Sequence, residues 1–209
     1  MSRMRFHGAT KSRLRAPDDG IVLSGRGTGW LLDRWTTMLD SFASTHGARL
    51  SQGRNLARTG RVRGLWFSPG VASAQVIAEE AFNVSLRFRV FSDREWAQVL
   101  QRLLGDLHQL GALLDGRLEQ DFVDALSADG IQLLPQPSDV EGDCDCEDYM
   151  LPCAHMAAVH HVVAEALDGQ PNLLFTLRGR PPAQWLAEVR RAWGDVRVAS
   201  LPPHDEALS

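Results

Sequence analysis

The sequence predicts an α+β fold in which a small antiparallel β-meander is accompanied by several helices. Phe82 to Val90 alternate between apolar and polar residues, which is the pattern of a half-buried strand. The segment that begins at Asp93 repeats apolar residues every three or four positions instead, which is the pattern of an amphipathic helix. With 209 residues, 44% of them hydrophobic, the chain can bury a sizeable core.

The first expected helix covers residues 28–44, where Trp30, Trp35 and Met38 belong to an apolar stripe. Gly47 is expected to end this helix. Three short strands should follow and form the meander, at residues 62–67, 71–78 and 82–90. The Ser68-Pro69-Gly70 sequence is a turn signal between the first two strands.

The second half of the chain should be mainly helical. Ser92 and Glu95 form a capping-box pattern that predicts a helix start. Further helices are expected at residues 107–114, 119–126, after Cys153, and at 183–193. Ile131 to Leu134 is a candidate strand, 138–141 is a polar lead-in to the cysteines, and 178–182 is a basic turn.

Charge is distributed unevenly along the chain, although the formal net charge is only −4. Residues 1–70 contain 12 basic and four acidic residues, whereas residues 71–209 contain 10 basic and 22 acidic residues. A basic first third indicates a surface that faces a polyanion. The alternative is an ordinary solvated, arginine-rich surface.

Four residues form the candidate metal site: Cys144, Cys146, Cys153 and His155. Cys144-Asp145-Cys146 and Cys153-Ala154-His155 each provide two ligands, and the six residues between the pairs can close a loop around one ion. Three thiolates and one imidazole form a set typical of structural zinc. The second pair should open a helix, whose N-terminal dipole favours a thiolate.

Other interpretations of the cysteines are less consistent with the sequence. The acidic, turn-like surroundings do not suit three buried apolar residues, and a disulfide would leave one thiol over. Iron–sulfur ligation remains an alternative. His160 and His161 are rival imidazoles, but they lie off the helical face of His155 and are interpreted as surface or packing residues.

The Cys-x-Cys-x₆-Cys-x-His motif resembles the SWIM zinc finger family, and Gly53-Arg54, Ala57-Arg58 and 174–180 resemble flanking blocks of bacterial members. The resemblance implies a zinc finger made of a short β-hairpin-like loop plus a helix. The expected organisation is a flexible basic arm (1–27), an α+β region with the meander (28–137), the SWIM-type finger (138–168), a C-terminal helical extension (169–200) and a tail (201–209).

The resemblance also implies a zinc-binding interaction module, a non-enzymatic accessory protein that acts with a Swi/Snf-type helicase or other DNA-processing protein. Direct DNA or RNA binding by the basic third is the alternative. Its candidates are Arg54, Arg58, Arg61 and Arg63, together with Arg3, Arg5, Lys11, Arg13 and Arg15. The competing interpretation is that Arg54 and Arg58 pair with acids of the second half.

The sequence gives no sign of an enzyme or a membrane protein. It contains no Gly-x-x-x-x-Gly-Lys-Ser/Thr loop, no His-Glu-x-x-His and no Gly-x-Ser-x-Gly, and it lacks the order of motifs of a zinc deaminase. No apolar run approaches the roughly 20 residues of a membrane helix, and the N-terminus has no apolar signal region. The expected location is therefore the cytoplasm.

Overall fold

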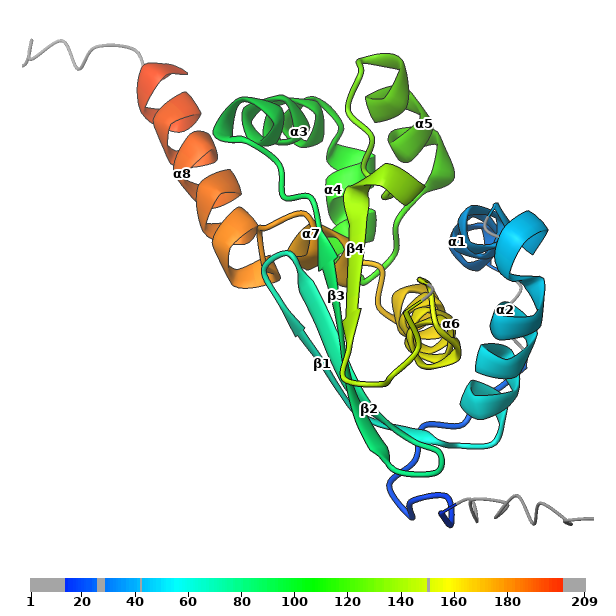
Figure 1. The fold of residues 1–209 in the computed structure, drawn as a ribbon. Helices are drawn as coiled ribbons and strands as arrows, with labels where there is room; N and C mark the ends of the chain where they lie inside the picture. Colours follow the sequence, from blue (N-terminus) through cyan, green and yellow to red (C-terminus); the bar gives the residue numbers. More distant parts are fainter. Residues whose placement is uncertain (1–13, 26–28, 42, 150, 201–209) are drawn as a thin grey trace, which may run out of the picture.

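The computed structural model describes residues 14–25, 29–41, 43–149 and 151–200. It confirms the α+β class, with a four-stranded antiparallel sheet and helices on one side and at one end of it (Figure 1). The elements in chain order are α1 (Trp30–Asp40), α2 (Ala43–Arg58), β1 (Val62–Ser68), β2 (Val71–Ile77), β3 (Ala81–Phe88), α3 (Asp93–Gly105), α4 (Leu107–Leu114), α5 (Gln120–Ala128), a 3₁₀ turn (Pro137–Asp139), β4 (Val140–Cys144), α6 (Ala154–Gly169), α7 (Leu173–Leu177) and α8 (Pro182–Ser200).

The predicted meander is confirmed as β1–β2–β3, and β4 extends it at the far edge in the order β1-β2-β3-β4. Alternate residues on the strands face the helices and are buried, as the period of two requires. These inward residues include Ala72, Val76, Val84 and Leu86. The opposite face of the sheet carries polar side chains.

Helix α6 forms the centre of the core and lies between the sheet and α2 (Figure 1). Eleven of its residues are buried, on all sides of the helix rather than on a single stripe. Gly53 of α2 permits the close approach of the two helices. A Cβ atom there would lie only 2.5 Å from the Cβ of Ala157 and 2.7 Å from the carbonyl oxygen of Ala154.

The first helical region differs from the sequence-based expectation. A single helix over 28–44 was predicted, but the structure has α1 and then α2, which runs through Gly47 to Arg58. A glycine inside a helix costs about 1 kcal/mol. The packing of α2 against α6 compensates for that cost, so Gly47 does not end the helix.

The predicted strand at Ile131–Leu134 is wrong, and the strand that does form, β4, lies where a polar lead-in was expected. The carbonyl oxygens of Gln132 and Leu133 accept hydrogen bonds from the buried Arg178 guanidinium at 2.6 and 2.9 Å. Their backbone is therefore paired with a side chain and not with a neighbouring strand.

Two other features bear on the expected organisation. Residues 14–25 of the predicted arm contact the sheet, since the Leu14 N–H bonds to the Ala78 carbonyl and Ile21 forms a β-bridge with Val62. A single hydrophobic core reaches from Leu31 to Val189. Among the described residues, no helix is long and apolar enough to cross a membrane.

Candidate metal centre

The four residues predicted as metal ligands converge on one point. The three Sγ atoms and a ring nitrogen of His155 all lie within 4.8 Å of one another. Ligand atoms at the corners of a tetrahedron around zinc are about 3.5–3.8 Å apart, given bond lengths of roughly 2.0–2.3 Å. The distance of 3.8 Å between Cys144 Sγ and His155 Nδ1 is consistent with that spacing. The cluster could therefore hold a metal ion.

Each ligand comes from a defined local structure. Cys144 ends β4, which places its side chain on the inward face of the sheet next to α6. Cys153 is the N-cap of α6, and its sulfur accepts a hydrogen bond from the Met156 N–H at 3.4 Å. His155 lies in the first turn of the same helix, and its ring stacks on Phe82 with the ring centroids 4.2 Å apart. Phe82 thus orients the imidazole.

The three cysteine thiols differ in the direction in which their pKa values are shifted. The pKa of Cys153 is lowered to about 4, chiefly by the hydrogen bond from Cys144 and also by those from His155 and the Met156 N–H, while burial acts in the opposite direction. The pKa of Cys144 is raised because its thiol hydrogen-bonds to the Cys153 sulfur and is partly buried. Burial raises the pKa of Cys146. The geometry thus favours a first thiolate at Cys153, at the positive end of the α6 dipole.

Two polar contacts anchor the ligand loop. Asp145 accepts hydrogen bonds from the backbone N–H and the side-chain amide of Asn83, both at 2.9 Å. Asp148 accepts two from Arg49 of α2, at 2.9 and 3.1 Å. Hydrogen bonds therefore hold the loop to β3 on one side and to α2 on the other. The sequence-based reasoning missed Phe82, Asn83 and Arg49, because their positions give no local signal of contact with the motif.

The rival histidines are buried and lie outside the ligand cluster. Burial lowers the pKa of His160 to about 3, with a smaller effect from the charge of His161. Burial also lowers the pKa of His161 to about 4, assisted by the nearby charge of Arg54. Both imidazoles are neutral at pH 7, in keeping with packing positions.

The predicted basic residues have divergent roles. Arg61 donates hydrogen bonds to the carbonyl oxygens of Leu14 and Ile77, and Arg63 donates two to the Gln75 side chain. Arg54 and Arg58 are exposed on α2, and no ion pair is found for either among the described residues. Arg15 pairs with Asp18 at 3.3 Å. Arg3, Arg5, Lys11 and Arg13 lie outside the described residues.

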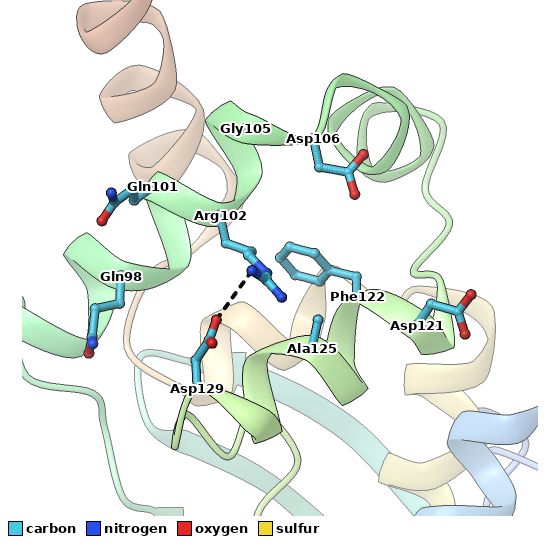
Figure 2. A pocket seen from close by; sticks show the side chains of 9 residues that line it. All are labelled: Gln98, Gln101, Arg102, Gly105, Asp106, Asp121, Phe122, Ala125 and Asp129. Carbon is cyan, nitrogen blue, oxygen red and sulfur yellow. Dashed lines mark ion pairs between the residues drawn. The ribbon is translucent and has the colours of Figure 1, made fainter.

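A separate polar hollow of about 750 Å³ lies between α3 and α5 (Figure 2). Arg102 of α3 faces Asp129 after α5, and the two charged groups are 3.5 Å apart. Asp106 and Asp121 add two carboxylates to the lining. The guanidinium is thus already paired, and the hollow is separate from the metal ligands.

The sequence is 31% identical over 203 residues to uncharacterized protein Rv2102 of Mycobacterium tuberculosis. The alignment covers 94% of this chain and 72% of that protein, so the similarity extends well beyond the Cys/His segment. No protein-family model matches the sequence, and no solved structure gives a significant match.

Proposed function

We propose that this chain, which belongs to the same family as uncharacterized protein Rv2102 of Mycobacterium tuberculosis, is a zinc-binding interaction module of the SWIM type. In this proposal it is a non-enzymatic accessory protein that acts with a Swi/Snf-type helicase or another DNA-processing protein. The convergence of Cys144, Cys146, Cys153 and His155 is the observation that carries the proposal.

The donor set supports zinc as the bound metal. Three sulfur donors and one imidazole exclude the hard cations calcium and magnesium, which take oxygen ligands. Zinc accepts such a set tetrahedrally. When bound, the ion would crosslink the end of β4 to the first turn of α6.

The completeness of the set supports a structural role. Four side chains from the protein supply all four ligands of a tetrahedral ion, which leaves no position for a water or a substrate. Asp145 and Asp148 hold the loop to the rest of the fold, as expected for a site whose purpose is rigidity. A closed structural site has no open position for catalysis, so we propose a non-enzymatic protein.

Apolar surface next to the loop supports partner binding. Tyr149 is 97% exposed and Leu151 is 56% exposed, which is unusual for large apolar side chains at neighbouring loop positions. Leu151 also lines a mainly apolar hollow of about 260 Å³, together with residues that include Leu39, Leu50 and Met156. Exposed apolar side chains beside a hollow are typical of a protein-binding surface.

Two measurements test this proposal. Zinc content per chain, measured by mass spectrometry of the intact protein and by elemental analysis, should be close to one. Co-purification of the tagged chain from its native host should recover a helicase or another DNA-processing protein. Tyr149→Ala combined with Leu151→Ser should weaken that recovery at unchanged zinc content. Trp193→Ala, which removes an exposed aromatic residue on α8, is the matched control.

Recovery of no DNA-processing protein would argue against the partner, whereas absence of zinc would argue against the module itself.

A second candidate, direct nucleic-acid binding, is favoured by the exposed side chains of Arg54 and Arg58 on α2. Binding through these arginines must weaken steeply with salt, and Arg54→Ala/Arg58→Ala should reduce it.

A further inference from the structure

The polar face of the sheet carries a large aromatic side chain that the core does not use. Trp66 of β1 is 68% exposed and lies opposite Ser73 of β2, on the face that points away from α6. Indole rings are usually well buried, so an exposed one in the middle of a strand indicates a binding surface.

A row of outward-facing side chains crosses the sheet from this tryptophan. In register, Trp66 pairs with Ser73, Ser73 with Ser85, and Ser85 with Asp143 of β4. Ser73, Ser85 and Asp143 line a furrow of about 340 Å³, and Trp66 lies next to it through its pairing with Ser73. The row therefore has an indole at one end, hydroxyl groups along its floor and a carboxylate at the other end.

One wall of the furrow is a chain of hydrogen-bonded amides. Arg63 donates two hydrogen bonds to the Gln75 oxygen, at 2.9 and 2.7 Å. The Gln75 amide donates to the Asn83 oxygen at 3.2 Å, and the Asn83 amide donates to Asp145 at 2.9 Å. The amide groups are thus held in fixed orientations before any ligand arrives.

We propose that this furrow binds an unpaired base of a single-stranded nucleic acid, with the base stacked on Trp66. A flat aromatic ring on an open sheet is the platform on which proteins stack unpaired bases, with edges then read by hydrogen bonds. The Gln75 and Asn83 amides each have a second N–H that matches an acceptor on a base edge, and a carboxylate such as Asp143 accepts from amino groups.

The charge distribution indicates on which side of the row the phosphates of a bound strand would lie. Arg63 and Arg87 flank the row on either side. Arg63 lies 3.8 Å from the exposed carboxylate of Asp19, whereas no ion pair is found for Arg87 within the described residues. Asp143 and Glu141 make β4 acidic. The phosphates should therefore follow the β1–β3 side.

This inference does not depend on the metal or on the protein partner. The test is fluorescence anisotropy with the full chain and labelled single strands of DNA and RNA, about 12 nucleotides long, in about 50 mM salt. Wild type should bind at least one of the two single strands saturably and the matching duplex more weakly. Trp66→Ala should weaken binding by about 5- to 150-fold, the range for loss of one stacked base.

Matched variants distinguish stacking from general attraction. Trp66→Phe should keep most of the affinity because it retains an aromatic face, and Trp193→Ala should bind like wild type. Circular dichroism should show that Trp66→Ala melts within about 2 °C of wild type, since the side chain is largely exposed. Equal affinity of Trp66→Ala and wild type would overturn the inference, as would no single-strand binding or stronger binding of the duplex. Loss only in Arg54→Ala/Arg58→Ala would overturn it in favour of the α2 arginines.

Discussion

Arg178 and Asp139 form a buried ion pair across the metal-binding segment, with 2.9 Å between Nη2 and the carboxylate oxygen. The Arg178 side chain is completely inaccessible, and it also donates to the carbonyl oxygens of Arg89, Gln132 and Leu133. The pair joins the residue before β4 to the residue after α7. It therefore closes the segment that contains both the metal ligands and α6.

Replacing Arg178 should strongly destabilise the fold. Arg178→Met removes one of the two arginine partners of Asp139, since Arg89 stays 3.4 Å from its carboxylate. It also removes a donor from three buried or partly buried carbonyl groups, and the combined loss should cost about 3–5 kcal/mol. Arg178→Lys keeps the charge but cannot reach all four acceptors, so it should still cost about 2 kcal/mol. Urea unfolding followed by circular dichroism measures both. The exposed Arg190 of α8 gives a control, and similar effects of Arg190→Met and Arg178→Met would contradict this interpretation.

The closely packed glycine of α2 should be sensitive to a single methyl group. Gly53→Ala places a Cβ within 2.5 Å of Ala157 and should destabilise the protein by about 1–3 kcal/mol, although alanine is the better helix former. Gly47→Ala is the matched change in the same helix, where nothing lies within 4 Å of the added atom. It should stabilise by about 0.5–1 kcal/mol. Thermal unfolding of the two variants should shift in opposite directions.

The metal should hold the loop between Cys146 and Cys153 in place. Cys146→Ser should lower zinc content and make the exposed Tyr149 and Leu151 region more accessible to protease. Chelation of wild type should have the same effect, because metal binding and loop ordering are coupled. Limited proteolysis with mass-spectrometric mapping measures this, and Tyr149→Ala is a control that leaves the ligands intact. Full zinc occupancy with unchanged cleavage in Cys146→Ser would remove Cys146 from the ligand set.

Buried neutral His160 should make stability depend on pH. Its pKa falls from about 6.5 in the unfolded chain to about 3 in the fold, so the unfolded state binds more protons between these values. Stability should therefore drop as pH falls below about 6.5, by on the order of 2 kcal/mol at pH 5. The titratable neighbour of His160 is His161, which in turn feels the charges of Arg54 and Asp40.

His160→Leu isolates this effect. The Nδ1 atom of His160 is buried without a hydrogen-bond partner among the described residues, so leucine removes both the titration and a poorly satisfied polar atom. The loss of stability between pH 7 and pH 5 should be smaller in the variant, while metal loss affects both proteins alike. An identical pH profile for the two would show that His160 does not contribute.

The Cys/His cluster and the meander were predictable from sequence because both are encoded locally. Cys-x-Cys and Cys-x-His place ligands two positions apart, and Phe82 to Phe88 alternate in the period of a strand. The capping box of Ser92 and Glu95 is also confirmed. Each of these signals lies within a few residues, so tertiary context did not need to be known.

The features that the sequence did not reveal depend on distant partners. β4 reads as a polar segment because it is an edge strand whose alternate residues, Glu141 and Asp143, face solvent. Arg178 looked like part of a basic turn, since nothing local shows that it reaches Asp139 and three carbonyl groups. The expected strand at 62–67 contains Trp66, and only the register of the sheet shows that this residue faces outward.

The position of β4 at the edge of the sheet gives the metal site a second consequence. Cys144 is the last residue of this strand, so a bound ion would pin the strand in place beside β3. If the metal were lost and β4 detached, the backbone groups of β3 would become an open template for strands of other molecules. A bound ion would then also protect the protein against aggregation, and removal of the metal should make the protein assemble into insoluble aggregates.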